Sequence, residues 1–150
     1  MDIKSEEERS RNMSKIRAKN TRPERFIRSE LHKLGYRFRV NSDLVEGHPD
    51  IYFTKKRIAI FVHGCYWHRH TNCKSAYTPK SNVDFWMKKF SRNIERDKTV
   101  VGVLKDEHIR VIIIWECTVK SIMTNNSVKE ESLNKIRTFI NSDTPQNIEI

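Results

Sequence analysis

The chain has 150 residues, of which 37% are hydrophobic and 32% are charged. This length suits one ordinary domain that buries a core without disulfides, and the periodic blocks of apolar residues exclude a disordered chain. Lys and Arg number 29 against 19 Asp and Glu, so the formal net charge is +10. The excess favours a polyanionic partner such as nucleic acid, with plain solubility as the alternative; no basic amphipathic helix suggests a membrane surface.

Neither a signal peptide nor a membrane span is predicted. Residues 1–8 contain no apolar run and include three consecutive glutamates. No segment approaches the roughly 18 apolar residues that a span needs. The three cysteines are an odd number, which argues against a disulfide framework and favours a metal or free thiols. We therefore expect a cytoplasmic monomer without membrane contact.

The first predicted element is a basic arm or surface helix over residues 1–20. It has little apolar content to anchor it, and its cations include Arg9, Arg11, Lys15 and Arg17. The main domain is predicted over 21–141 and begins with a helix. There Thr21 can cap, Pro23 suits the first turn, and Glu24 stands at the capping-box position. Apolar residues then recur at helical spacing until Gly35 stops the helix.

Three strands, a helix, a strand and a last helix are predicted to follow. The strands cover 36–40, 50–53 and 57–62, by alternation or apolar content. A capping-box pattern at 81–84 opens a helix to about residue 105, in which we expect Phe85 and Phe90 to be core. An apolar run over 109–115 predicts a central strand, 127–140 a helix, and 142–150 a loose tail. This order predicts one α/β domain with a mixed sheet flanked by helices.

A loop between predicted elements carries a group of potential metal ligands. Cys65, His70 and Cys73 lie in one loop as C-x4-H-x2-C, and Cys117 follows the apolar strand 109–115. Four ligands of the Cys3His type suit a closed, tetrahedral structural zinc site, which would pin a loop that has few apolar residues of its own. The alternative is three small buried cysteines and an unrelated histidine.

A second potential metal site begins at Pro49-Asp50, where a predicted strand starts. Many nucleases hold Mg²⁺ with an Asp at a β-hairpin beside another acceptor on the adjacent strand, because Mg²⁺ prefers oxygen ligands and keeps several waters. In the broad Pro-Asp…(Asp/Glu)-x-Lys nuclease superfamily, a carboxylate and a lysine follow on the second strand. Residues 61–63, Phe-Val-His, stand in that place here, so both of those groups are absent.

Several ordered motifs resemble the very short patch repair (Vsr) DNA mismatch endonucleases, over roughly residues 8–120. They are Arg9 to Glu24, Gly47-His48-Pro49-Asp50, Phe61 to His70, Phe85-Trp86, Asn93 to Asp97 and Trp115-Glu116-Cys117. The resemblance implies a restriction-endonuclease-like core of the PD-(D/E)xK type together with the structural zinc. It also implies a magnesium-dependent enzyme that nicks duplex DNA on the 5′ side of the T in a T:G mismatch produced by deamination of 5-methylcytosine. Such an enzyme starts a short repair tract and has a functional link to a DNA cytosine methyltransferase and the repair machinery.

The resemblance also implies roles for individual residues. Asp50 and the backbone carbonyl of Val62 would bind Mg²⁺, and His68 would activate the attacking water. Asp97 would support His68 or the hydrated metal, while Glu24 and His63 would complete the site. From the residues alone, Asp97 is also compatible with a solvated helix face, and Glu24 with a helix cap.

DNA recognition is implied at two places. The aromatic rings of Tyr66, Trp67 and Trp86 would intercalate beside the T:G pair, which is easier to distort than a matched pair. Core packing is the alternative for one of these rings. The arm cations would hold backbone phosphates or lie along the opposite groove.

Two other functions remain compatible with the residues. One is a different metal-dependent DNA nuclease of the same superfamily, which a comparison of mismatched with matched duplexes would separate. The other is a non-catalytic zinc-containing DNA-binding module, which charge and the cysteine pattern alone would fit.

Overall fold

The structure is a computed structural model, and it describes residues 5, 7 and 19–150. The predicted basic arm, with Arg9, Arg11, Lys15 and Arg17, therefore lies almost wholly outside the described residues. The described elements are α2 (Arg22–Lys33), β1 (Arg39–Val40), β2 (Ile51–Phe53), β3 (Ile58–His63), α3 (Val83–Asp106), β4 (Arg110–Trp115), α4 (Glu116–Thr124), α5 (Asn126–Asn141) and β5 (Ile148–Glu149).

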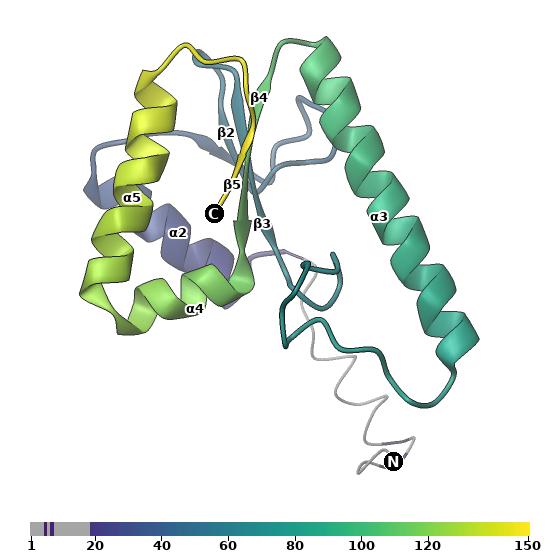
Figure 1. Ribbon diagram of the computed structural model, residues 1–150. Coiled ribbons are helices and arrows are strands. Elements are labelled where there is room, and N and C mark those ends of the chain that lie inside the picture. Colours follow the sequence, from purple (N-terminus) through teal and green to yellow (C-terminus); the bar gives the residue numbers. More distant parts are fainter. Residues whose placement is uncertain (1–4, 6, 8–18) are drawn as a thin grey trace.

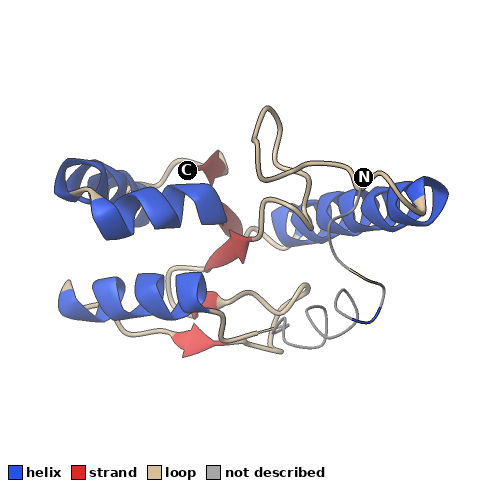
Figure 2. Cartoon of the chain, turned by 90° about the horizontal axis from the view of Figure 1, so that it is seen from below, coloured by secondary structure: helices blue, strands red, loops and turns tan. Residues whose placement is uncertain are grey.

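The elements form three layers, with the sheet in the middle. Helices α2, α4 and α5 cover one face, and the long helix α3 stands alone on the other (Figure 1). The view from below shows the same division (Figure 2). The 64–82 loop, which joins β3 to α3, lies below the sheet in Figure 1.

The sheet is mixed, as the element order predicted. Its strand order is β1-β2-β3-β4-β5, with antiparallel pairing among β1, β2 and β3 and parallel pairing from β3 to β5. Ile51 of β2 lies opposite Ile60 of β3, and His63 of β3 lies beside Trp115 of β4. The start of β2 therefore lies beside the C-terminal ends of β3 and β4, at one end of the sheet. This places the terminal side chains of the three strands near one another.

Side-chain alternation along β3 and β4 builds two cores. Ile58 and Ile60 belong to the larger cluster under α2, α4 and α5, whereas Ala59 and Phe61 belong to a smaller one with Leu104 of α3. Successive side chains of a strand point to opposite faces, so a strand covered on both sides has no polar face. This explains why both strands read as continuous apolar runs in the sequence.

Helix α2 confirms the predicted start signals. The Thr21 hydroxyl accepts from the backbone N–H of Glu24, and Pro23 lies in the first turn. The Glu24 carboxylate does not return to the cap residue but accepts from the backbone N–H of Asn20 at 2.8 Å. The helix ends at Lys33, and Gly35 follows with φ +92°, a conformation that glycine adopts without strain.

Helix α3 begins at Val83, within the predicted start at 81–84. Its cap residue Asn82 has φ +52° and makes no side-chain capping bond. Of the two phenylalanines predicted to be core, Phe90 is buried, but Phe85 is 59% exposed. Along its 24 residues this helix buries only Phe90 and Leu104, so most of its surface faces solvent or the cleft described below.

Two elements were not predicted. Helix α4 starts directly at the end of β4, where no breaker separates them, and only Asn125 divides it from α5. Strand β5 lies within the predicted loose tail 142–150 and pairs parallel with β4, with Ile148 opposite Ile112. The backbone N–H of Ile150 also donates to the carbonyl of Ile113 at 2.9 Å, so the end of this segment is held to the sheet.

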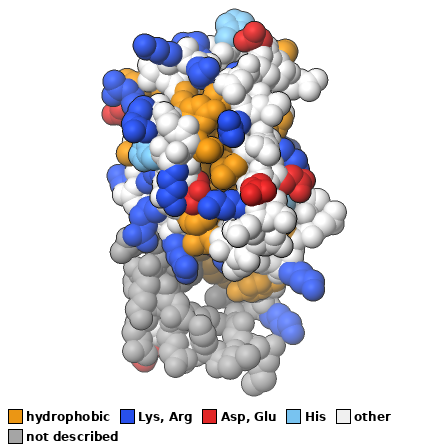
Figure 3. All heavy atoms as spheres, turned by 90° about the vertical axis from the view of Figure 1, so that its left-hand side faces the viewer, with side chains coloured by type: hydrophobic (Ala, Val, Ile, Leu, Met, Phe, Trp, Pro, Cys, Tyr) orange, Lys and Arg blue, Asp and Glu red, His pale blue; other side chains and the backbone are white. Residues whose placement is uncertain are grey.

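Basic side chains are spread over one face of the molecule. Figure 3 shows the side of the molecule that is left-hand in Figure 1, where Lys and Arg are scattered among apolar patches and outnumber acids. On this face the positive charge is therefore not gathered into one patch. Across the part of the chain that the structure describes, none of the helices is both long and apolar enough to cross a bilayer.

Candidate metal and catalytic site

A cleft of about 640 Å³ opens at the end of the sheet where β3 and β4 end and β2 begins. The cleft lies between this end of the sheet, the start of α2 and the middle of α3. Every residue for which the sequence analysis gave a catalytic or magnesium-binding role lines it: Glu24, Asp50, Val62, His63, His68 and Asp97. Residues from five separate parts of the chain thus meet in one cavity.

Asp50 is fixed at the first position before β2. Its carboxylate Oδ2 accepts a hydrogen bond from the backbone N–H of Val62 at 2.7 Å. Burial, followed by the negative charge of Glu24, raises the pKa of Asp50 to about 7. A half-buried and a buried carboxyl group that repel one another favour binding of either a proton or a cation.

The carbonyl of Val62 faces the same side as Asp50. In an extended strand, the N–H and C=O of one residue point to the same edge. Because the N–H of Val62 reaches the Asp50 carboxylate, its carbonyl oxygen also lies on the Asp50 side of β3. The Asp50 carboxylate and the Val62 carbonyl are oxygen groups of the kind that Mg²⁺ prefers, and the magnesium role stays a prediction.

A histidine pair and a carboxylate form the opposite wall of the cleft. The rings of His63 and His68 stack with centroids 3.8 Å apart and planes 7° apart. Nδ1 of His68 lies 2.7 Å from Oδ2 of Asp97 on α3. A carboxylate only accepts, so Nδ1 of neutral His68 carries the proton and Nε2 is left as a proton acceptor.

His63 stays neutral over the physiological range. Burial, and then the neighbouring ring of His68, lower the pKa of His63 to about 3. A neutral imidazole can accept a hydrogen bond or ligate a cation, but one with so low a pKa is a weak base. The two stacked histidines therefore differ in surroundings, since His63 is buried and His68 is hydrogen-bonded to Asp97.

Glu24 belongs to a polar network that the sequence analysis missed. It is 4% exposed, and its Oε2 lies 3.4 Å from Nη2 of Arg28, one helical turn further along α2. Arg28 also reaches the side chains of Asn20 and Asn41. The sequence held one signal of this network. Arg28 stands on the same helical face as the apolar Ile27 and Leu31, and a buried arginine needs polar partners.

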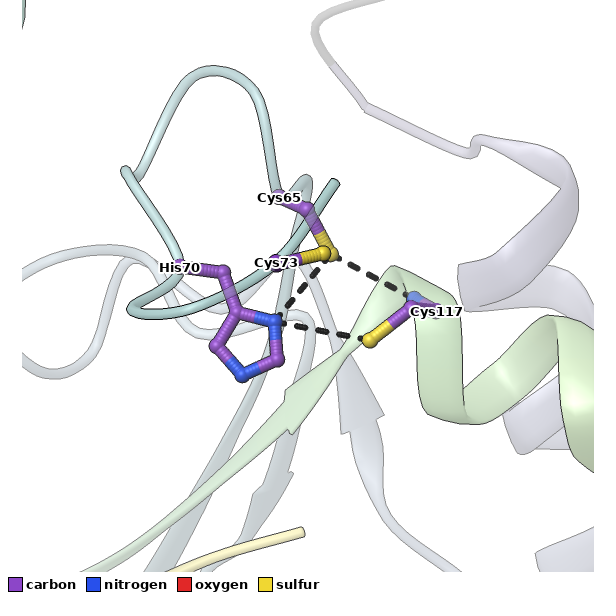
Figure 4. Close-up of side chains that lie close together, drawn as sticks. All are labelled: Cys65, His70, Cys73 and Cys117. Carbon is purple, nitrogen blue, oxygen red and sulfur yellow. Dashed lines mark hydrogen bonds between the residues drawn. The ribbon is translucent and has the colours of Figure 1, made fainter. Parts of the chain in front are cut away.

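The four potential zinc ligands converge as predicted (Figure 4). The ligand atoms of Cys65, His70, Cys73 and Cys117 all lie within 4.8 Å of one another. Nδ1 of His70 is 3.6 Å from Sγ of Cys65 and 3.4 Å from Sγ of Cys117. A tetrahedral zinc with bonds of about 2.3 Å to sulfur and about 2.0 Å to nitrogen separates S and N by about 3.5 Å. The group is therefore a candidate Cys/His metal site.

The chemistry of this group also fits a cation. Burial raises the pKa of Cys65 to about 12, so a thiolate there needs a positive partner. The backbone N–H of Cys117 donates to Sγ of Cys65 at 3.4 Å, a bond that stabilises a ligating thiolate. Of residues 64–82, only Cys65 is fully buried, so apolar packing contributes little to holding this loop.

The predicted intercalating rings lie together beside the cleft. Tyr66, Trp67 and Trp86 are half-buried and pack edge-on or tilted, with centroids 5.0 to 6.0 Å apart. Tyr66 and Trp86 also pack on buried Phe90. Lys89, which the sequence analysis did not select, lies over the ring of Trp67 at 5.1 Å.

A single tryptophan joins the two candidate sites. The ring of Trp115 at the end of β4 stacks on His70 with centroids 4.2 Å apart and meets His63 edge-on at 5.4 Å. Its Nε1 lies 3.3 Å from Oε2 of Glu149 on β5. The Cys/His group and the histidine pair therefore share one wall.

Comparison with known proteins gives consistent matches. The family profile described as "DNA mismatch endonuclease Vsr" matches residues 1–75. The type II nicking enzyme V.XorIIP of Xanthomonas oryzae pv. oryzae is 42% identical over 81% of this chain and 88% of the relative. The type II nicking enzyme V.NmeAIP of Neisseria meningitidis is 38% identical over 90% and 93%. The DNA mismatch endonuclease Vsr of Escherichia coli is 35% identical over 79% and 76%.

Proposed function

The chain belongs to the Vsr family and is a DNA endonuclease, and we propose that it nicks duplex DNA on the 5′ side of the T in a T:G mismatch, with Mg²⁺ in the active site. The observation that carries this proposal is the meeting of Asp50, Val62, His63, His68 and Asp97 in one cleft. The position of Asp50, directly before β2 and beside β3, also supports a restriction-endonuclease-like core. The second carboxylate and the lysine of that superfamily are absent from β3.

We propose that Asp50 and the carbonyl of Val62 hold the Mg²⁺, with Glu24 nearby as a further acid. The donor set is oxygen only and leaves room for waters, which suits Mg²⁺ better than zinc. When bound, the ion neutralises charge on the phosphate and favours deprotonation of water. Asp50 and Glu24 repel one another when both are ionised, and such a cation would offset this repulsion. In the absence of the cation, burial and the charge of Glu24 raise the pKa of Asp50.

His68 is proposed as the general base. Its Nε2 accepts a proton from the attacking water while Asp97 holds Nδ1–H and stabilises the imidazolium that forms. The water oxygen forms a bond to phosphorus, and the bond from phosphorus to the leaving deoxyribose oxygen breaks. The leaving oxygen takes a proton from solvent, so the step is a balanced hydrolysis.

Zinc is proposed as the ion of the Cys/His group. Three thiolates and one imidazole around a tetrahedral point are typical of closed structural zinc sites, and no position is left for a substrate. The ion would tie the loop that carries Tyr66, Trp67 and His68 to the start of α4 through Cys117. Its contribution is therefore to hold the reading and catalytic side chains in place.

The rings of Tyr66, Trp67 and Trp86 are proposed to enter the base stack beside the mismatch. Their half-buried packing leaves exposed ring area on a rigid base, and rigid aromatic wedges suit partial unstacking of base pairs. The arm cations Arg9, Arg11, Lys15 and Arg17 are proposed to hold phosphates. The T:G specificity points to deaminated 5-methylcytosine as the source of substrate, and so to a functional link with a DNA cytosine methyltransferase.

Nicking of a panel of labelled duplexes tests this proposal. Wild-type protein should nick the T:G duplex far faster than matched DNA or other mismatches, only with Mg²⁺, and at one mapped position. Asp50→Ala should abolish nicking and preserve DNA binding, because the metal stabilises charge mainly in the transition state. The control Asp43→Ala alters an exposed acid of the neighbouring loop and should behave as wild type.

His68→Ala separates the base from the metal site. It should lose about 10²–10⁴-fold in rate and keep residual nicking, because the metal ligands stay in place. Equal nicking of all duplexes would favour the alternative of a different nuclease in the same superfamily. An Asp50→Ala protein that nicks at the wild-type rate would overturn the active-site proposal.

A further inference from the structure

Arg28 is a buried cation that faces the cleft without lining it. Its side chain is 9% exposed. Nη1 donates to Oδ1 of Asn20 at 2.8 Å, while Nη2 donates to Oδ1 of Asn41 at 3.0 Å and to the backbone carbonyl of Asp50 at 3.1 Å. The same Nη2 lies 3.4 Å from the Glu24 carboxylate. One guanidinium thus contacts both proposed acids of the magnesium site.

Stability alone does not explain this arrangement. A buried ion pair gains little free energy over an apolar replacement of similar volume, because desolvation offsets the attraction. Nε of Arg28 is also buried with no hydrogen-bond partner among the described residues, which adds a further cost. Such costs are expected where a charged group serves a geometric purpose.

The geometry that Arg28 fixes is the separation of two acids. Asp50 stands just outside the ladder of β2, so its peptide carbonyl is held by Arg28 and by the backbone N–H of Asn41. Glu24 is held by the same guanidinium and by the backbone N–H of Asn20. Without this tie, the repulsion between the half-buried Asp50 and the buried Glu24 carboxylates would move them apart.

Asn20 and Asn41 hold the guanidinium in turn. Both have left-handed backbone conformations, with φ +58° and +45°, which place their side-chain amides beside Arg28. Nδ2 of Asn41 also donates to Oδ1 of Asn20 at 3.0 Å. The planar fork of the arginine matches this set of acceptors, whereas the single ammonium of a lysine cannot reach all of them at once.

We infer that Arg28 is a positioning residue of the endonuclease, whose guanidinium holds the Asp50 backbone and the Glu24 carboxylate in place at the proposed metal site. This inference rests on the proposed function of Asp50 and Glu24. Its consequence is that the shape of the side chain at position 28 sets the rate, and that its positive charge alone is not sufficient.

The test compares Arg28→Lys, Arg28→Met and Asn41→Gly with wild type. Lysine keeps the charge and loses the fork, methionine loses both, and glycine keeps the left-handed backbone at 41 while removing one amide that orients the guanidinium. Arg25→Lys is the matched control, because Arg25 lies exposed on the same helix. The measurement is the single-turnover nicking rate on a T:G duplex, with enzyme and Mg²⁺ saturating, so that an unfolded fraction does not change the result.

Both Arg28 variants should lose about 10²-fold in rate, since displacement of a reacting group by about 1 Å costs that much. Asn41→Gly should lose about tenfold in rate, which corresponds to about 1.4 kcal/mol of activation free energy. Arg25→Lys should lose nothing. Affinity for the duplex without Mg²⁺ should stay unchanged in all four. If Arg28→Lys nicks at the wild-type rate, charge alone suffices and the inference is wrong; if the Arg28 variants do not fold, Asn41→Gly at the wild-type rate has the same meaning.

Failure of the proposed function gives a different pattern. In that case wild-type nicking would not need Mg²⁺, or Asp50→Asn would nick at the wild-type rate. If both of those controls behave as proposed while the Arg28 and Asn41 variants match wild type, only the positioning role is refuted.

Discussion

The two perturbed groups of the cleft should give opposite pH dependences of stability. The pKa of Asp50 is raised from 3.8 to about 7, and that of His63 is lowered from 6.5 to about 3. For Asp50 the stabilising contribution is fully present below about pH 4 and is lost as the pH rises towards 7. For His63 the contribution is present above about pH 6.5 and is lost as the pH falls towards 3.

The magnitude follows from proton linkage. Between about pH 5 and about pH 6.5, folded Asp50 holds one proton more than the unfolded chain, and folded His63 approaches one proton fewer at the acidic end. Each group therefore changes the free energy of unfolding by up to about 1.4 kcal/mol per pH unit, with opposite signs. The two slopes largely cancel in wild-type protein, so each becomes visible only when the other group is removed.

The variants Asp50→Asn and His63→Gln separate the two slopes. Urea unfolding is measured on zinc-loaded, magnesium-free protein across this pH range. Acidification should destabilise Asp50→Asn and stabilise His63→Gln relative to wild type, by up to about 1.4 kcal/mol per pH unit each. All other titrating groups are shared, so they cancel in the differences, and Asp43→Asn serves as the exposed control.

Mg²⁺ extends the same experiment. Saturating Mg²⁺ should hold Asp50 ionised and remove its slope from wild type, so that wild-type protein then follows Asp50→Asn. The reasoning is refuted if Asp50→Asn and His63→Gln have the same slope as wild type without Mg²⁺, because neither proton affinity would then be perturbed by the fold.

Two further predictions concern the loop and the rings. Cys117→Ser should lose the zinc and much of the thermal stability, since structural zinc supplies about 10–16 kcal/mol of binding free energy in small domains; metal analysis and thermal unfolding check this, and a metal-free protein of unchanged stability contradicts it. Trp67→Ala should reduce the preference for mismatched over matched DNA by about tenfold, the worth of one stacked ring, while zinc content stays unchanged. Equal loss of affinity for both duplexes would point to a folding role for Trp67.

The sequence predicted the elements whose signals are local. Thr21 and Pro23 marked the start of α2, and the apolar run at 109–115 marked a strand buried on both faces. Strand β5 has two residues in a polar segment and exists because β4 offers it an open edge, which no local pattern reveals. Helix α4 follows β4 without a breaker, so its beginning was invisible in the sequence.

The candidate site was only partly accessible from the residues. The spacing of Cys65, His70, Cys73 and Cys117 pointed to a metal by itself, whereas the partnership of His68 with Asp97 joins a loop to a helix 29 residues later and came from the family resemblance. Arg28 was not predicted, because it is one of several cations on a helix that carries many basic residues. Its position on the same face as Ile27 and Leu31 distinguishes it only when burial is considered.

The place of Trp115 between two histidines has an evolutionary consequence. One face of its ring lies on His70 and its edge meets His63, so position 115 is constrained from the metal loop and from the catalytic cleft at once. A smaller side chain would remove the ring contact that each histidine makes with this position. Lineages that change this residue should therefore carry compensating changes on both sides together, and a change on one side alone should be selected against.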